Sequence, residues 1–122
     1  MRFDSARLSD YALRAALVIP FAYHGAWNLG AQGGAWWSEH SGLPPALRFA
    51  VGLGELCASL GIALRVLHRV AASMMAVIML AAVQVHAPQG FSFKTVGCET
   101  PFVYALLCVS LALSPRSESA KS

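Results

Sequence analysis

The chain has 122 residues, a length that fits one domain. Hydrophobic residues make up 57% of it and Asp, Glu, Lys and Arg only 12%, about half the charged fraction of an ordinary soluble domain. The net charge of +3 comes from basic residues scattered in ones and twos, which gives no support for nucleic acid binding. We therefore expect residues 1–122 to form a single domain whose solvent is the lipid bilayer.

The first apolar segment covers residues 11–29, close to the length of about 20 residues with which a helix crosses the hydrocarbon core. Pro20 at its centre frees the carbonyl of Ala16 and predicts a kink. A charged stretch followed by an apolar run also resembles a secretory signal. Because this run contains polar residues that a signal core avoids, we expect it to stay in the mature protein.

The second apolar segment covers residues 46–64 and follows Pro44 and Pro45, which favour a helix start because a first-turn proline loses no hydrogen bond. Glu55 lies near its middle, too far from either membrane surface to reach water, and so must face the bundle interior. A stripe of small residues on this segment predicts the close approach of a neighbouring helix. Its members are Ala50, Gly54, Ala58 and Gly61.

The third and fourth segments cover residues 70–85 and 94–113. The uninterrupted apolar part of the fourth, residues 102–113, is only about 18 Å long as a helix, against a hydrocarbon core of about 30 Å. Either the helix starts near Lys94 or the bilayer thins there. In the first case Glu99 becomes an intramembrane or interfacial carboxylate that faces protein.

The distribution of Lys and Arg predicts the orientation of this all-α, four-helix transmembrane bundle. Seven basic residues fall on one side, namely Arg2, Arg7, Arg14, Arg65, Arg69, Arg116 and Lys121, and two on the other, Arg48 and Lys94. Basic residues are enriched on the cytoplasmic side, so we expect both termini there. The loop with Trp36 and Trp37 is then outside, and its tryptophans suit a role as anchors at the membrane interface.

Polar side chains from all four predicted helices fall at similar depth in the outer half, with Glu55 below them. They are His24, Asn28, Arg48, His86 and Glu99. A charge in the bilayer costs about 2.5–3.5 kcal/mol on insertion scales, so each needs a partner or a purpose. We hypothesise that these six residues line one ligand-binding pocket open to the outer side. The alternative is a set of polar core groups that satisfy one another, with Glu55 in an ion pair or protonated.

The sequence gives little support for a metal site or for a function that depends on cysteine thiols. Cys57, Cys98 and Cys108 form no CxxC pair, and Cys57 and Cys108 lie inside apolar segments, where they are interpreted as small buried hydrophobic residues. Two metal-based alternatives remain: a b-type haem between His24 and His86, or a metal held by these histidines with Glu55 and Glu99. Neither has the close ligand spacing that makes such a motif specific, so we predict no metal site.

Short motifs in a fixed order make the chain resemble the DoxX family of small four-helix membrane proteins. The motifs are Arg14, His24-Gly25, Gly54-Glu55-Leu56, Leu60-Gly61, Arg69, Ala71-Ala72, His86 and Gly97-Cys98-Glu99. Two features differ: Asn28 stands where many relatives carry a lysine, and the stretch 114–122 lacks a glycine-rich ending followed by an acidic residue. The resemblance implies a multi-pass protein of the bacterial cytoplasmic (inner) membrane.

Two functions follow from this resemblance and from the polar cluster. The first is a redox-associated membrane subunit whose pocket takes a quinone or a lipid-like ligand, with electrons supplied by an oxidoreductase partner, because relatives are associated with quinone-reducing membrane assemblies. The second is a non-catalytic protein that helps a membrane or exported partner to assemble. The sequence assigns no catalytic residue and leaves open whether the chain is an enzyme.

Overall fold

The computed structural model describes residues 4–91 and 97–114, and every regular element in this part of the chain is a helix. The long helices are α1 (Ser5–Leu29), α3 (Leu47–Ala63), α4 (His68–His86) and α5 (Glu99–Leu113). The short elements are α2 (Ala31–Trp36), the π-helix η1 (Trp37–Ser41) and the 3₁₀ turn η2 (Ala87–Gln89). The all-α prediction is confirmed for the described residues, and each predicted segment overlaps one long helix.

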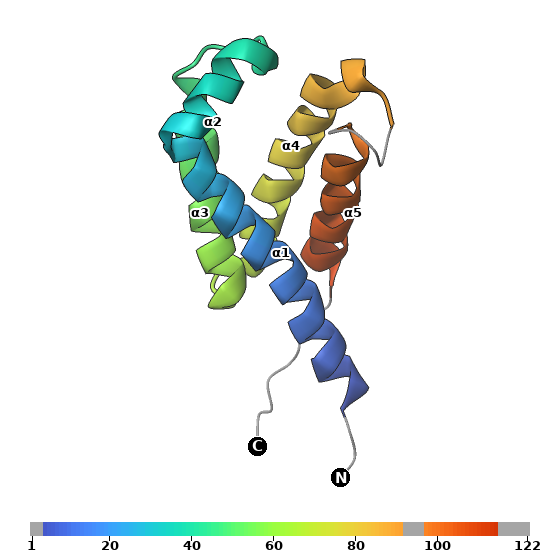
Figure 1. Ribbon diagram of the computed structural model, residues 1–122. Helices are drawn as coiled ribbons and strands as arrows, with labels where there is room; N and C mark the ends of the chain where they lie inside the picture. The colour runs from blue at the N-terminus through green and yellow to red at the C-terminus, as the bar shows by residue number, and fades with distance from the viewer. Residues whose placement is uncertain (1–3, 92–96, 115–122) are drawn as a thin grey trace.

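The long helices alternate in direction and form two antiparallel pairs, α1 with α3 and α4 with α5 (Figure 1). These pairs have the most extensive interfaces, and α3 joins them by packing also against α4. α1 meets α5 over a smaller area, where the rings of Phe21 and Tyr104 lie 5.3 Å apart. Toward the end of the bundle that carries α2, the ribbons of the two pairs diverge (Figure 1).

Arginines tie α1 and α3 together at both ends. At the end where α1 begins, which we call the basic end, Arg14 Nε lies 3.0 Å from both carboxylate oxygens of Asp10, and its Nη1 donates to the carbonyl of Ile62 at 3.0 Å. At the opposite end Arg48 Nη1 donates to the carbonyls of Asn28 and Gly30, at 2.6 and 2.9 Å. Cationic groups are favourable at helix C-termini, so each helix caps the last turn of its partner.

Between these arginines the backbones of α1 and α3 are in contact at two glycines. A Cβ atom added to Gly25 would lie 2.7 Å from the carbonyl oxygen of Gly52, and one added to Gly52 would lie 2.9 Å from the carbonyl oxygen of Gly25. The predicted small-residue stripe instead faces α4, where Gly54 approaches Ile78, while Ala50 is exposed. A close helix approach was expected correctly, but the tightest contact is made by Gly52.

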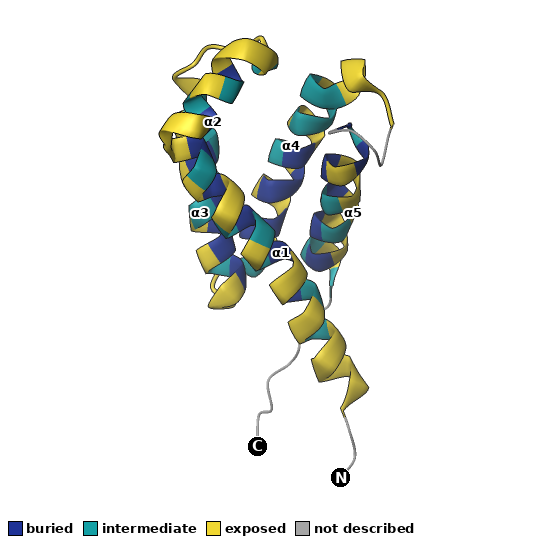
Figure 2. Cartoon of the chain, in the orientation of Figure 1, coloured by how far each residue is buried: buried dark blue, intermediate teal, exposed yellow. Residues whose placement is uncertain are grey.

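Each long helix has a buried face and an exposed face (Figure 2), but polar side chains lie among the buried residues and large apolar side chains lie on the surface. Polar residues that are 8% exposed or less are Arg14, Asn28, Glu55, Ser59 and Glu99. Large apolar side chains are exposed on every long helix, for example Ile19, Leu53, Val77 and Leu106. Cys57, which the sequence predicted to be buried, belongs to this exposed face of α3. The surface of the bundle is thus more apolar than parts of its interior.

Helix lengths are uneven. Within the described residues, the stretch 68–89 is the one helix long and apolar enough to cross a membrane, with a mean hydropathy of 1.9. α3 and α5 have 17 and 15 residues, about 25 and 22 Å. The expected start of the last helix near Lys94 is wrong, because Gly97 and Cys98 are not helical and α5 begins at Glu99. Lys94 itself lies outside the described residues.

Candidate functional site

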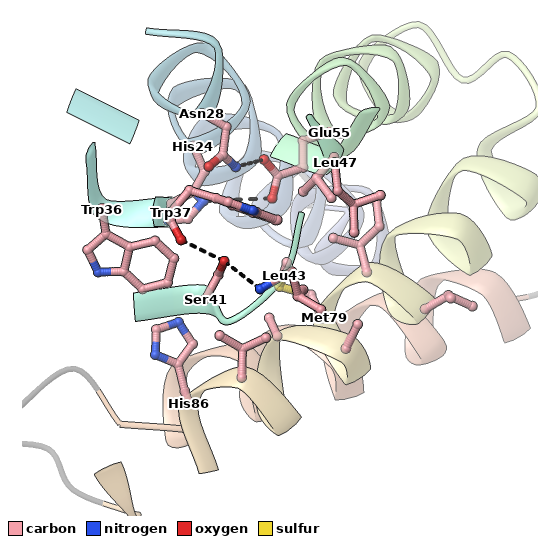
Figure 3. A pocket seen from close by; sticks show the side chains of 16 residues that line it. His24, Asn28, Trp36, Trp37, Ser41, Leu43, Leu47, Glu55, Met79 and His86 are labelled. Carbon is pink, nitrogen blue, oxygen red and sulfur yellow. Dashed lines mark hydrogen bonds and ion pairs between the residues drawn. The ribbon is translucent and has the colours of Figure 1, made fainter. Parts of the chain in front are cut away.

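A cavity of about 220 Å³ lies between α1, α3 and α4 at the end of the bundle opposite the basic end (Figure 3). Its polar lining comes mainly from α1, α3 and α4: His24, Asn28, Glu55 and His86. Aromatic and polar residues of α2 and η1 cover it, namely Trp36, Trp37 and Ser41. Aliphatic side chains of α3, of α4 and of the segment before α3 complete the wall. The cavity is therefore apolar, with a few polar groups gathered on one side.

The carboxylate of Glu55 is the most deeply buried of these polar groups, with the residue 1% exposed. Asn28 Nδ2 donates to its Oε2 at 3.0 Å, and His24 Nδ1 lies 3.7 Å from its Oε1 (Figure 3). The side chain of His24 is 58% exposed, so the pair joins a buried acceptor to an accessible imidazole. A proton on His24 would make this contact an ion pair, and a ligand could exchange protons with it.

Local sequence explains how the three side chains meet. His24 and Asn28 are four residues apart, so they lie on the same face of α1. The glycine contact brings this face against α3, since a Cβ atom on Gly25 would lie 3.1 Å from that of Glu55. Arg48 binds the carbonyl of Asn28 and holds the last turn of α1 in place. The contacts of Glu55 with His24 and Asn28 are therefore set by the packing of α1 on α3, whereas α4 contributes to the wall of the cavity.

Aromatic rings connect α1 to α4 across the covered end of the cavity. The ring of Trp27 lies 5.7 Å from His24 and 6.1 Å from Trp36, and Trp36 lies 5.4 Å from His86. His40 stacks on Trp36 at 5.6 Å. The ring contact between Trp36 of α2 and His86 of α4 thus closes this end of the cavity (Figure 3).

The covering segment is held by small residues and by hydrogen bonds. A Cβ atom on Gly33 would lie 2.2 Å from the carbonyl oxygen of Trp27, so α2 folds back against α1 only with glycine there. Trp37 Nε1 donates to the carbonyl of Pro44 at 3.2 Å. The sequence predicted a loop with tryptophan anchors at the membrane interface. The structure places Trp36 and Trp37 in helical residues that line the cavity.

Four of the six predicted site residues line this one cavity: His24, Asn28, Glu55 and His86. Arg48 does not, because its guanidinium turns to the backbone of α1 and does not reach Glu55. Glu99 is 4% exposed in the first turn of α5, where the helix dipole favours a negative charge, but no side chain of α5 lines the cavity. The prediction that Arg48 and Glu99 join the pocket is therefore wrong.

Sequence reasoning missed the tryptophans and the aliphatic wall. Leu47 and Val51 precede Glu55 at intervals of four residues and share its face of α3, a signal that could have found them. The covering role of Trp36 had no such signal, because it depends on how α2 folds back. Within residues 4–91 and 97–114, no group of three or more His, Cys, Asp or Glu side chains is arranged to hold a metal ion.

Comparison with known proteins agrees with the motif pattern. The sequence profile of the DoxX family matches residues 9–88, which include α1 to α4 and the whole lining of the cavity. No curated protein and no solved structure matches the chain. Since the match covers more than half of the chain, this protein belongs to the DoxX family.

Proposed function

We propose that this chain crosses the bacterial cytoplasmic membrane four times and binds a quinone-like headgroup in the cavity beside Glu55. The observation that carries the proposal is the buried Glu55 carboxylate, which meets Asn28 and His24 at the wall of an otherwise apolar cavity. Ligand sites usually combine mainly apolar walls with a few polar groups that fix orientation. The cavity has this composition.

The apolar exterior supports a membrane location for all four long helices. A buried guanidinium at the basic end and a buried carboxylate at the cavity end would be unusual in so small a water-soluble protein with so little charge. α3 and α5 are a few ångströms short of the hydrocarbon thickness, a mismatch that local thinning of the bilayer accommodates at modest cost.

The orientation places the basic end in the cytoplasm and the cavity in the outer half of the membrane. The chain offers two test positions, Ser38 on η1 and His68 at the start of α4. A cysteine replacing Ser38 is expected to react with a membrane-impermeant maleimide added to intact cells, whereas one replacing His68 should react only after lysis. The native cysteines are first replaced by Ala or Ser. The reverse labelling pattern would contradict the orientation.

The size of the cavity supports a single substituted ring. An engineered apolar cavity of about 150 Å³ holds benzene, so 220 Å³ leaves room for one ring with small substituents. A quinone presents two oxygens that accept hydrogen bonds, and a protonated His24 beside Glu55 is a suitable donor. Because the chain shows no motif for an electron-carrying cofactor, electrons would come from a partner subunit.

Displacement of a tritiated benzoquinone analogue from protein in nanodiscs tests this proposal. His24→Ala is expected to weaken binding at least about tenfold, which corresponds to about 1.4 kcal/mol. His68→Ala is a matched control, because His68 begins α4 at the basic end and does not line the cavity. Absence of saturable binding to the parent protein, or equal losses in both variants, would refute the ligand function.

A role in assembly of a membrane or exported partner is the second candidate, and one observation favours it. Among the described residues, no buried side-chain nitrogen or oxygen lacks a hydrogen-bond partner. The Glu55 cluster is thus satisfied without a ligand and could serve only to fix the packing of α1 on α3. Co-purification of a partner protein in mild detergent, together with no quinone binding, would favour this candidate.

A further inference from the structure

Val77 of α4 belongs to two hollows of the protein at once. It lines the cavity beside Glu55, and it also lines a shallow groove on the exterior of α4 with Arg69, Val70, Ser73 and Met74. Its side chain is 68% exposed. Val77 is therefore the point at which the interior of the cavity meets the surface of the bundle.

The rim of the cavity is open and apolar along the edge between α3 and α4. Leu43 and Leu47 line the cavity on the α3 side of this edge and are 38% and 41% exposed. Val77 and Ala81 line it on the α4 side, one turn apart, and both are exposed. The covered end, by contrast, is closed by the contact of Trp36 with His86. An occupant of the cavity thus has an apolar way out to the side.

The groove beyond Val77 runs toward the basic end. Val70, Met74 and Val77 follow one another at intervals of three or four residues, so they form a stripe about 10 Å long on one face of α4. Val70 and Met74 are 63% and 41% exposed, and Arg69 ends the stripe. A flexible apolar chain that leaves the cavity past Val77 meets this stripe directly.

We propose that the ligand of the cavity is an amphiphile whose apolar tail leaves between α3 and α4 past Val77 and lies along the α4 groove. The inference rests on the proposed function and adds the route of the tail. It implies that the ligand enters sideways from the bilayer and not from the aqueous phase. The occupant of the groove is the tail of the same molecule whose ring lies beside Glu55.

Two benzoquinone probes test the route, one without a side chain and one with a decyl chain, both measured in nanodiscs. Met74→Trp fills the groove beyond the exit, and Met74 does not line the cavity, so this variant is expected to weaken the decyl probe at least about tenfold relative to the parent and to change the tailless probe less than about threefold. Leu80→Trp is the matched control, because Leu80 is 53% exposed on the same helix but lines neither hollow. It should leave both affinities unchanged.

A decyl probe with a diazirine at the end of its chain gives an independent readout. Photolysis is expected to label the peptide that contains residues 70–77, and unlabelled decyl probe should compete. Labels on α1 or α5, or equal effects of Met74→Trp on both probes, would overturn the route while leaving the cavity site intact. Labelling of residues 70–77 by a photoactivatable phospholipid that the decyl probe does not reduce would overturn it too. No binding of either probe to the parent protein would refute the proposed function as well.

Discussion

At the basic end of the bundle, Arg14 is surrounded by partners, whereas at the cavity end Glu55 has partners on one side and open space on the other. Arg14 binds two carboxylate oxygens and a backbone carbonyl, and a second guanidinium, that of Arg65, lies 2.6 Å from the same Asp10 carboxylate. Glu55 meets two side chains of α1 and borders an apolar cavity of about 220 Å³. Both groups are buried in an apolar bundle.

The difference lies in what the neighbouring helices do. At the basic end, the last turn of α3 brings the Ile62 carbonyl to α1 and the turn after α3 brings Arg65, so the polar groups are closed in by backbone and by opposite charge. At the cavity end the α4–α5 pair diverges from α1 and α3, and the ring contact of Trp36 with His86 bridges the space. A buried charge that is fully surrounded serves stability, and one beside a cavity is available for binding. The variants below test this division.

Arg14→Met is expected to have the largest effect on stability, because it leaves the Ile62 carbonyl without this donor and removes a partner of Asp10. Leaving this buried carbonyl without its donor costs about 1–3 kcal/mol, and loss of the ion pair with the partly exposed Asp10 adds up to about 1 kcal/mol. The midpoint of thermal unfolding in detergent is the measurement, and Arg7→Met is the control. Among the described residues Arg7 pairs only with Asp4, and its side chain is 81% exposed. Equal midpoints for the two variants would show that Arg14 is not the main polar tie at this end.

Gly25→Ala should destabilise both the basic end and the cavity end. Gly25 lies between these two regions, and the added methyl group pushes α1 away from α3. The added methyl group would meet the backbone oxygen of Gly52 at 2.7 Å, and backbone cannot yield cheaply, so we expect a loss of about 3 kcal/mol. Gly54→Ala is the matched control on the face toward α4. Its new atom would lie 3.4 Å from Ile78, an ordinary contact, and a comparable loss there would contradict the assigned helix contact.

Glu55→Leu is expected to cost about 1–3 kcal/mol, because the amide of Asn28 loses its acceptor. Glu55→Gln should be tolerated better, since the amide oxygen still accepts a hydrogen bond. Thermal unfolding of both variants beside binding of the tailless quinone probe separates the two roles of this residue. If both variants unfold at the same temperature, Glu55 contributes nothing through its polar contacts.

The smallest expected effect is a pH dependence at the basic end. Asp10 lies one residue before the apolar part of α1, and the hydrogen bond from Arg14 holds the pKa of its carboxyl below the ordinary value of 3.8. A lowered pKa means that the stabilisation is complete above about pH 4 and is lost as the pH falls through the folded-state value. With Asp10 partly exposed, we expect less than about 1 kcal/mol. Asp10→Asn should flatten this acid-side loss in urea titrations, and parallel curves for parent and variant would argue against it.

The sequence predicted the helical segments and the burial of Glu55 because both depend on local pattern and on the cost of charge in lipid. His24, Asn28, Glu55 and His86 were found together for the same reason, since depth along alternating helices follows from residue number. The partners of Arg48 could not be predicted this way. The long side chain of an arginine can reach a backbone carbonyl of another helix as easily as a carboxylate of the same helix. Only the packing of α1 on α3 decides which of these partners Arg48 binds.

The covering segment shows a second limit. Residues 31–41 contain two glycines and two tryptophans, a composition that suits a loop at the membrane surface. Their helical turns depend on long-range contacts: Gly33 against the end of α1, Gly34 beside Arg48, and Trp37 on the Pro44 carbonyl. The late start of α5 is similar, because Gly97 and Cys98 precede a proline-containing first turn that no periodicity marks. Glu99 consequently lies on α5 away from the cavity.

The reciprocal arginine caps of α1 and α3 have a consequence for biogenesis. Arg14 reaches Ile62, and Arg48 reaches Asn28 and Gly30, so every group in these ties belongs to the first 62 residues of the chain. Chains emerge from the ribosome N-terminal end first, and membrane helices associate after insertion. On the proposed four-pass topology, the α1–α3 hairpin can therefore neutralise its own buried charges before α4 and α5 enter the bilayer. Hydrogen exchange on the intact protein should accordingly find the slowest amides around Gly25 and Gly52, with α4 and α5 opening first.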